Sequence, residues 1–318
     1  MVSSSKKVIA VVGATGSQGG GLARSILDDP AGEFAVRAIT RDPRSDKACA
    51  LAAAGAEVVA ADLADPASVR KAFEGAYGAY CVTFFWNHMS PDREREEARA
   101  LADAAGKARL QHVIWSTLED TRKWVPLSDP RMPTLQGHYK VPHFDVKGEA
   151  DEFFRATGVP TTYLLTSFYW DNFITFGMGP KPGPDGKLQF SLPMGDQPLP
   201  SIAAEDIGRC AHGIFRRGQE FAGRRVGIAA EHLTGAQMAA GLTRALGREV
   251  TYQAVPFDVF RGLGFPGADD LGNMFQFNHD FSDRFCAARS PEFTRSLNPR
   301  LQTYAQWLAE HVREIPLA

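Results

Sequence analysis

The sequence predicts an α/β protein, with a Rossmann-type, doubly wound parallel sheet and a smaller C-terminal α/β domain. In the first half of the chain, short apolar runs alternate with helical patterns, as in successive β-α-β units. The apolar runs are continuous, which is typical of strands that helices cover on both faces. A turn with regularly spaced glycines follows the first run and leads into a helix.

Capping and terminating residues delimit the elements of the first half. Asp65 and Ser90 each precede a proline, so each is expected to cap a helix that starts at that proline. Gly55, Gly75 and Gly158 follow helical patterns and are expected to end them. Strands are predicted over 8–14, 35–41, 57–63, 79–85, 112–118 and 161–168, and helices over 18–29, 45–54, 66–74, 91–108 and 143–157.

The alternation is less regular after residue 168. A short strand over 199–202 and a helix over 204–215 are predicted to return to the main sheet. Later elements are expected as strands over 223–229 and 249–255 and as helices over 233–246 and 299–312. The predicted domains are a Rossmann domain of residues 1–168, to which 199–216 returns, and a smaller substrate or partner domain of residues 169–318.

The composition is that of a soluble globular protein, with 318 residues, 44% hydrophobic and 23% charged, and a formal net charge of -2. This balance argues against direct contact with nucleic acid or with an anionic membrane. Four cysteines lie far apart without zinc-like spacing, so no metal is expected. Because we find neither a signal-peptide pattern nor an apolar stretch of about 20 residues, we expect a cytoplasmic protein.

A dinucleotide site is predicted at the glycine turn. Gly13, Gly16 and Gly19 have GxxGxxG spacing between a strand and a helix. Such glycines permit the tight turn, the approach of a pyrophosphate to the backbone, and close packing of helix on strand. The helix N-terminus then offers N–H groups and the positive end of its dipole to the phosphates. An ordinary strand-turn-helix is the alternative, but four further β-α units favour the cofactor.

The residues after the second predicted strand favour NADP(H) over NAD(H). Arg41 and Arg44 could clamp a 2′-phosphate, and Ser45 could donate a hydrogen bond to it at a helix start. An NAD site would place an acidic residue here to bind the ribose, and Asp42 keeps that alternative open. A solvated, charged loop is the structural alternative.

The glycine turn with Gln18, the loop from Thr40 to Arg44, the pair Gly148-Glu149 and the segment Gly-Phe-Pro-Gly-Ala at 264–268 resemble the NmrA-like family. These proteins are atypical members of the short-chain dehydrogenase/reductase superfamily. The resemblance covers nearly the whole chain and is closest to a branch that senses NADPH in animals. It implies a Rossmann fold with a small α/β domain, NADP(H) binding and, in many members, no demonstrated turnover.

The resemblance also implies roles for individual residues. It places the pyrophosphate at Gly13, Thr15, Gly16, Ser17 and Gln18, the 2′-phosphate at Arg41 and Arg44, the adenine at Asp62 and Leu63, the nicotinamide ribose at Thr83, Phe85 and Lys147, and the nicotinamide under Tyr169, Trp170, Asp171 and Asn172. Helix capping by Asp62, and a place in the core for Thr83 and Phe85, are the alternatives. A lysine of the sensing branch corresponds to Glu96 here, which puts the cofactor contact at that point in doubt.

The catalytic candidates are Ser116, His143 and Lys147. A typical member of the superfamily uses a serine after the fifth strand and a tyrosine four residues before a lysine on the next helix, where residues four apart share one face. Here Ser116 and Lys147 are present, but His143 occupies the tyrosine position. A neutral imidazole beside an ammonium is a poor proton donor at pH 7, so the usual relay is disfavoured. An iminium substrate, or protonation by Lys147 or water, stays open, as do Tyr139 and Tyr169 as donors and a purely structural His143.

Two functions are therefore expected as alternatives. The first is an NADPH/NADP⁺ sensor that regulates a protein partner and lacks the usual catalytic tyrosine. The second is an NADPH-dependent reductase of a small carbonyl, imine or related unsaturated compound. The predicted helices 91–108 and 143–157 could form a homodimer, as in this superfamily. The insert 119–142 is either a lid or a connecting loop, and the aromatic segment 271–281 lines a pocket, binds a partner or fills the core.

Overall fold

The computed structural model describes residues 6–183 and 185–317, and the chain divides into two compact units. Unit 1 comprises the residues up to Glu119, Val146–Leu165 and Glu205–Val226. Unit 2 comprises Asp120–Asp145, Thr166–Ala204 and the residues from Gly227 onward. Within residues 6–183 and 185–317, no helix combines the length and the apolar character that crossing a bilayer requires.

Unit 1 is built on a seven-stranded sheet with the strand order β11-β6-β5-β4-β1-β2-β3. The strands are β1 (Lys7–Val12), β2 (Phe34–Thr40), β3 (Glu57–Ala60), β4 (Gly78–Cys81), β5 (His112–Thr117), β6 (Thr161–Leu165) and β11 (Arg225–Gly227). Neighbouring strands among β1 to β6 pair in parallel. Because β1 lies between β2 and β4, the strand order reverses at β1, and ligands bind at the carboxyl edge of such a reversal.

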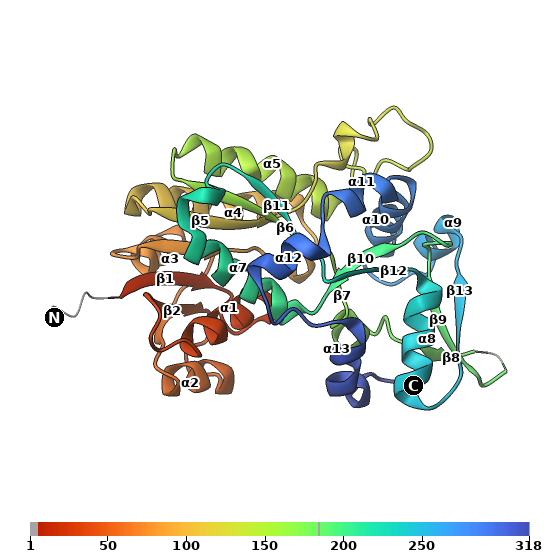
Figure 1. Cartoon of the computed structure of the whole chain (residues 1–318). Coiled ribbons are helices and arrows are strands. Elements are labelled where there is room, and N and C mark those ends of the chain that lie inside the picture. Colours follow the sequence, from red (N-terminus) through yellow and green to blue (C-terminus); the bar gives the residue numbers. More distant parts are fainter. Residues whose placement is uncertain (1–5, 184, 318) are drawn as a thin grey trace. The chain divides into compact units, whose positions relative to one another are not determined.

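Helices cover both faces of this sheet (Figure 1), which confirms the predicted Rossmann-type class. They are α1 (Ser17–Leu27), α2 (Asp46–Ala53), α3 (Pro66–Phe73), α4 (Pro91–Ala108), α5 (Pro142–Ala156) and α7 (Ala204–Arg217). Apolar residues of α3, α4 and α5 pack with the strands in one core cluster, which includes Phe73, Leu101 and Phe154. On the other face α1 and α7 touch through their backbones, since a Cβ on Gly21 would lie 2.3 Å from the carbonyl oxygen of Glu205.

The predicted caps are present in the structure. The side chain of Asp65 accepts a hydrogen bond from Ala67 N, and that of Ser90 accepts one from Arg93 N. Thr234 forms a reciprocal capping box with Gln237 at the start of α8 (Gly235–Leu246). These contacts satisfy backbone N–H groups that a helix start would otherwise leave unpaired.

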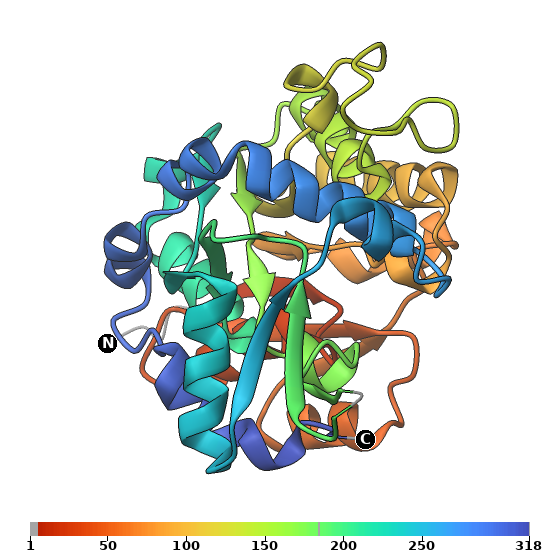
Figure 2. The ribbon, with the colours of Figure 1, turned by 90° about the vertical axis from the view of Figure 1, so that its right-hand side faces the viewer.

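Unit 2 contains two three-stranded sheets, with the orders β12-β10-β7 and β13-β9-β8. Their strands are β7 (Phe168–Tyr169), β8 (Lys181–Pro182), β9 (Leu188–Leu192), β10 (Leu199–Ile202), β12 (Glu231–Leu233) and β13 (Val250–Ala254). Helix α8 runs beside β13 (Figure 2). The remaining helices are α6 (Asn172–Thr175), α9 (Phe257–Arg261), α10 (Ala268–Asp280), α11 (Ser282–Ala287), α12 (Pro291–Leu297) and α13 (Tyr304–His311).

The structure differs from the sequence-based organisation at three places. The predicted strand over 199–202 forms, but as β10 it pairs with β7 and β12 of unit 2 rather than with the main sheet. The segment that groups with unit 1 is Glu205–Val226, and the insert Asp120–Asp145 groups with unit 2. A strand of four residues, three of them apolar, fits either sheet, because its sequence records burial but not its partners.

Candidate cofactor-binding site

The glycine turn is shaped as a phosphate site requires. Gly13 has a φ of +64°, and its carbonyl oxygen accepts a hydrogen bond of 2.8 Å from Gly16 N. A Cβ on Gly19 would lie 2.5 Å from that same oxygen, so only glycine permits this approach of α1 to the end of β1. Gly16 is the N-cap of α1 and has no side chain that could cover the first turn. The turn therefore fits a group that presents phosphate oxygens to backbone N–H groups.

The loop after β2 presents two arginines to solvent. Arg41 and Arg44 are both exposed, and within the described parts of the chain no carboxylate pairs with either guanidinium. The carboxylate of Asp42 accepts instead from Arg44 N at 2.9 Å, and Ser45 Oγ donates to Asp42 O at 3.0 Å. Asp42 therefore stabilises its own loop through these hydrogen bonds. Two exposed cations at this place fit a phosphate with more than one oxygen available.

Asp62 follows β3 and is exposed. Its Oδ1 accepts from Ala64 N at 3.0 Å, and its own N–H donates to Ser68 Oγ at 3.0 Å. These bonds belong to a turn that precedes α3, whose N-cap is Asp65. The adenine contacts of Asp62 and of the half-buried Leu63 stay predictions.

The side chain of Lys147, on α5, reaches the carboxyl end of β4, where its ammonium contacts three oxygens. Its Nζ is 2.6 Å from Thr83 Oγ1, 3.1 Å from Thr83 O and 2.7 Å from Glu94 Oε1. Thr83 Oγ1 in turn donates to Glu94 Oε1 at 2.5 Å. Lys147 is 9% exposed and Glu94 is 0% exposed. The three side chains thus form a buried, charge-balanced group beside the reversal of the strand order.

The sequence-based interpretation did not single out Glu94. A signal was present, because Glu94 stands in register with Ala98, Leu101 and Ala105, which form the buried face of α4. A carboxylate on the apolar face of a helix needs a partner, and here the partner is Lys147. Burial raises the pKa of Glu94, but the Lys147 ammonium and the hydrogen bonds from His88, Lys147 and Thr83 outweigh burial and lower this pKa to about 2.

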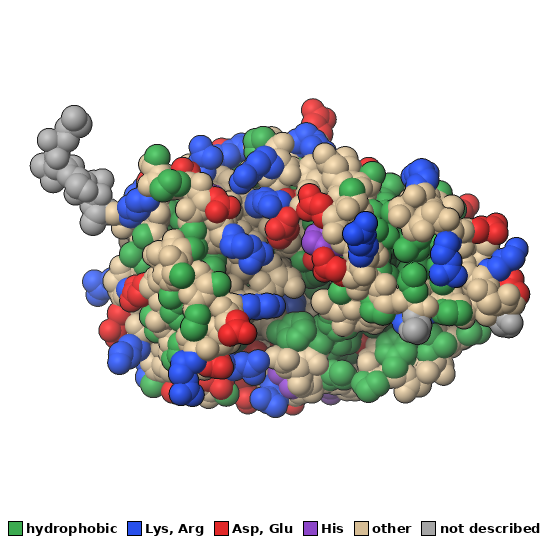
Figure 3. Space-filling model, turned by 90° about the horizontal axis from the view of Figure 1, so that it is seen from below, with side chains coloured by type: hydrophobic (Ala, Val, Ile, Leu, Met, Phe, Trp, Pro, Cys, Tyr) green, Lys and Arg blue, Asp and Glu red, His purple; other side chains and the backbone are tan. Residues whose placement is uncertain are grey.

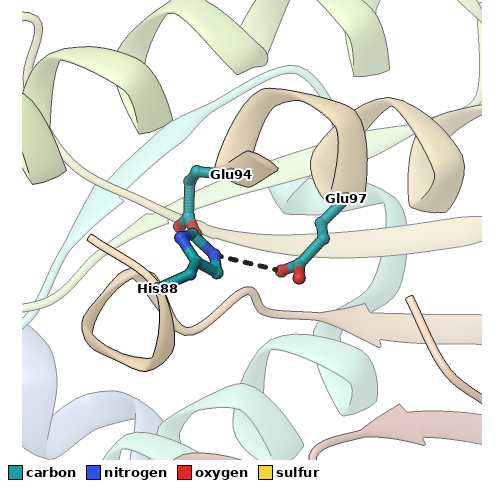
Figure 4. Close-up of side chains that lie close together, drawn as sticks. All are labelled: His88, Glu94 and Glu97. Atoms are coloured by element: carbon teal, nitrogen blue, oxygen red, sulfur yellow. Dashed lines mark ion pairs between the residues drawn. The ribbon is translucent and has the colours of Figure 1, made fainter. Parts of the chain in front are cut away.

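His88, Glu94 and Glu97 point toward one another beside this group (Figure 4). His88 Nε2 lies 3.5 Å from Glu94 Oε2 and 3.8 Å from Glu97 Oε2. The second nitrogen, Nδ1, accepts a hydrogen bond of 3.1 Å from Ser90 N, so Nε2 of a neutral ring carries the proton. A metal ion would need the Nε2 lone pair and would also meet the Lys147 ammonium across Glu94. The Lys147–Glu94 ion pair, with a neutral His88 facing both carboxylates, explains the cluster better than a metal site does.

The pKa of Glu97 is raised, first by burial and next by the negative charge of Glu94. The His88 side chain, which is 4% exposed, lies between these two carboxylates. The cluster thus places a neutral imidazole between two carboxylates, one of which pairs with the Lys147 ammonium, within a mostly buried part of unit 1.

Ser116 is turned toward the glycine helix. Its Oγ donates to Gln18 Oε1 at 2.8 Å, and the phenolic O–H of Tyr80 donates to the same oxygen. Ser116 is only 3% exposed. The carbonyl of Gln18 thus links α1 to β4 and β5, and the structure brings the predicted residues Gln18 and Ser116 together.

His143, in the first turn of α5, is held by Asp270 of α10. His143 Nδ1 lies 2.7 Å from Asp270 Oδ1, and the His143 backbone N–H donates to Asp270 Oδ2 at 3.2 Å. An ionised carboxylate only accepts, so Nδ1 carries a proton and Nε2 is the nitrogen that can gain or release one. The partner of the ring is thus a carboxylate. The Lys147 ammonium, which was expected beside this ring, is paired with Glu94.

Two aromatic residues, one expected at the nicotinamide (Trp170) and one at its ribose (Phe85), are buried against other rings. Trp170 is fully buried, with its ring centroid 5.3 Å from that of Tyr304 and 6.2 Å from that of Trp307, so its indole is core of unit 2. Phe85 is 3% exposed and packs edge-on against Trp86 and His88. Neither ring is available to a ligand without repacking.

The neighbours of Trp170 also have structural contacts. Tyr169 Oη donates to Thr166 Oγ1 at 3.1 Å, and Asp171 Oδ2 accepts from Ala204 N at the start of α7 at 2.8 Å. Asn172 begins α6. Tyr169, Asp171 and Asn172 are each partly exposed, and their contacts with a nicotinamide stay predictions.

The insert between β5 and α5 is fastened to α10 and to the start of α5. Asn273 Nδ2 donates to Lys140 O at 2.5 Å and to Pro133 O at 2.9 Å, and Gln276 Nε2 donates to Arg131 O at 2.8 Å. Asp145 accepts from Thr121 and from the backbone N–H groups of residues 140 and 141. Most of α10 is buried, in agreement with the core alternative for 271–281.

Comparisons with known proteins agree with this fold. The chain matches the NmrA-like family over residues 5–306. It is 29% identical to the NmrA-like family domain-containing oxidoreductase FrzB of Cladobotryum sp, covering 90% of this chain and 88% of that protein. It is 30% identical to the NmrA-like family domain-containing oxidoreductase cpsB of Aspergillus campestris, covering 86% and 83%.

Among solved structures, the negative transcriptional regulator NmrA is similar, with a TM-score of 0.79, 26% identity and 97% of each chain covered. NmrA has been solved in complex with NADP, a structure that matches with a TM-score of 0.78 at 26% identity, over 98% of this chain and 97% of that one. The family match spans both units of the chain. This protein is therefore a member of the NmrA-like family, within the atypical short-chain dehydrogenases/reductases.

Proposed function

We propose that this chain binds NADP(H) in unit 1, at the carboxyl edge of the seven-stranded sheet. The glycine turn at Gly13, Gly16 and Gly19 supports a pyrophosphate at the start of α1. The exposed guanidiniums of Arg41 and Arg44 support the 2′-phosphate of NADP(H) over the 2′-hydroxyl of NAD(H). The related NmrA structures in complex with NADP and with NAD support a nicotinamide cofactor at this site.

We further propose that the chain is a reductase of a small carbonyl, imine or related unsaturated compound. The observation that carries this choice is the hydrogen bond between His143 Nδ1 and Asp270, which orients an imidazole at the helix position of the usual tyrosine. The curated relatives FrzB and cpsB carry oxidoreductase in their names, which supports the same class. The cofactor, when bound, supplies the hydride.

We assign the remaining roles in the reaction to three residues of this chain. His143 would release a proton from Nε2 while Asp270 holds Nδ1–H, as in other carboxylate-imidazole pairs. Lys147, four residues later on α5, would bind the ribose hydroxyls from its position at Thr83. Ser116 would keep its O–H oriented through Gln18.

NADPH consumption with a panel of aldehydes, ketones, quinones and cyclic imines tests this proposal. We expect turnover of at least one class, reduced strongly in His143→Asn with cofactor affinity retained. Absence of turnover across the panel, with NADPH bound, would contradict the reductase and favour the second candidate.

The second candidate is an NADPH/NADP⁺ sensor that binds a regulatory partner. It is favoured by the missing tyrosine, by the engagement of the Lys147 ammonium with Thr83 and Glu94, and by the similarity to the regulator NmrA. On the face drawn in Figure 3, basic and acidic side chains are interspersed, which suits a protein partner better than nucleic acid. Light scattering and partner pull-down, each with and without NADPH, distinguish the sensor from the reductase. A sensor must change either its oligomeric state or its partner binding when NADPH binds.

A further inference from the structure

Glu94 is the carboxylate that balances the Lys147 ammonium. Lys147 Nζ lies 2.6 Å from Thr83 Oγ1, 3.1 Å from Thr83 O and 2.7 Å from Glu94 Oε1. Of these oxygens only that of Glu94 carries a formal charge. Because Glu94 is 0% exposed and Lys147 is 9% exposed, solvent screens the pair weakly.

The rest of the cluster keeps Glu94 ionised and fixed. Thr83 Oγ1 donates to Oε1, and His88 Nε2 faces Oε2 at 3.5 Å. Glu94 also lies near the start of α4, and the Ser90 cap stabilises that turn of the helix. The carboxylate therefore has little freedom to leave Lys147.

The Lys147–Glu94 pair lies where it would interact differently with the oxidised and the reduced cofactor. Thr83 and Lys147 lie at the carboxyl end of β4, beside the reversal of the strand order at which dinucleotides bind. The nicotinamide ring of NADP⁺ carries a positive charge that NADPH lacks. An uncompensated ammonium nearby would repel the oxidised ring, whereas the balanced Lys147–Glu94 pair repels it less.

We propose that Glu94 is a positioning residue for Lys147 that sets the relative affinity of the site for NADP⁺ and NADPH, by neutralising the Lys147 ammonium. This inference rests on the proposed binding of NADP(H). It assigns a function to a carboxylate that neither binds the cofactor directly nor belongs to the proposed proton donor. It also connects the two candidate functions, since both a reductase and a sensor depend on that relative affinity.

The experiment is a calorimetric titration of the full-length protein with NADP⁺ and with NADPH. Glu94→Gln keeps the shape of the side chain and an oxygen for Lys147, but removes the negative charge. We expect the ratio Kd(NADP⁺)/Kd(NADPH) to rise roughly tenfold, as for charges within about 10 Å at an effective dielectric constant of about 20. Asp103→Asn, which removes an exposed carboxylate from the same helix, should leave the ratio unchanged.

Two further variants separate charge from damage to the fold. Lys147→Met leaves the Glu94 charge uncompensated and should lower the same ratio, which gives a second measurement if Glu94→Gln does not fold. The double variant Glu94→Gln/Lys147→Met should return the ratio toward the wild-type value. A ratio in Glu94→Gln within twofold of wild type, or a Lys147→Met ratio that does not fall, overturns the inference. Failure of the wild type to bind either form would instead overturn the proposed cofactor.

Discussion

The ammonium of Lys147 lies 2.7 Å from Glu94 Oε1 inside unit 1, and Thr83 binds both groups. A buried pair of this kind is costly to break from one side, because the remaining charge stays buried without compensation. This relationship links the stability of unit 1 to the predicted cofactor site. Its consequences can be measured with and without ligand.

The Glu94 carboxylate predicts a specific pH dependence of stability. Its pKa is lowered from 4.5 to about 2 in the folded protein, so the folded state holds fewer protons than the unfolded state between these values. Stability from this group is complete above about pH 4.5 and is lost as the pH falls toward 2. Urea denaturation from pH 7 to pH 3 should therefore show a loss of about 2 kcal/mol, which Glu94→Gln does not share. Equal pH slopes in the two proteins would contradict this.

Substitution of Gly19 should damage both fold and binding. In Gly19→Ala the new Cβ would lie 2.5 Å from Gly13 O and 2.6 Å from Val12 O, so α1 must shift away from β1. We expect a loss of about 1–3 kcal/mol in unfolding free energy and no measurable NADPH binding. Gly262→Ala is the matched control, because its Cβ would meet ordinary contacts at 3.4 and 3.5 Å. Retained NADPH affinity in Gly19→Ala would argue against a cofactor at this turn.

Arg41 and Arg44 should determine selectivity for the 2′-phosphate. Each alanine substitution should weaken NADP⁺ binding about tenfold, as expected for a lost charge-assisted contact, and leave NAD⁺ binding unchanged. Arg70→Ala changes an exposed arginine on α3 by the same charge and should leave both affinities as they are. Equal losses for NADP⁺ and NAD⁺ would mean that these arginines act by general attraction rather than by contact.

The His143–Asp270 pair should matter for turnover and not for cofactor binding. His143→Asn should lower kcat about 10²-fold, the usual contribution of a general acid. Asp270→Asn should also lower kcat, because an amide can turn the imidazole to the other tautomer. Cofactor Kd should stay within twofold of wild type in both variants. A loss of affinity without a change in kcat would make His143 a structural residue.

The sequence predicted the local features of this fold and missed those that depend on distant partners. The strands of the main sheet, the caps at Asp65 and Ser90 and the tight turn at Gly13 follow from short-range patterns. The fourth strand is shorter than predicted and ends at Cys81, because an apolar run does not reveal where pairing stops. Strands β8 and β9 and helices α11 and α12 are too short or too mixed in pattern to have been recognised.

Parts of the candidate site could likewise not be predicted from the sequence. Asp270 is 127 residues from His143 in the chain, and no spacing rule connects them. Trp170 stands in an aromatic segment that fits a ligand or a core equally well, and only its packing against Trp307 decides between these. Glu94 could have been found from its register with Leu101, had the charged run at the start of α4 been placed on a helix face.

The most direct test of the central claim is a titration of the purified protein with NADPH, NADP⁺, NADH and NAD⁺ under one set of conditions. We expect saturable binding of NADPH and NADP⁺ with one site per chain, at least tenfold tighter than that of NADH and NAD⁺. No binding of any dinucleotide, or NAD⁺ bound as tightly as NADP⁺, would contradict it.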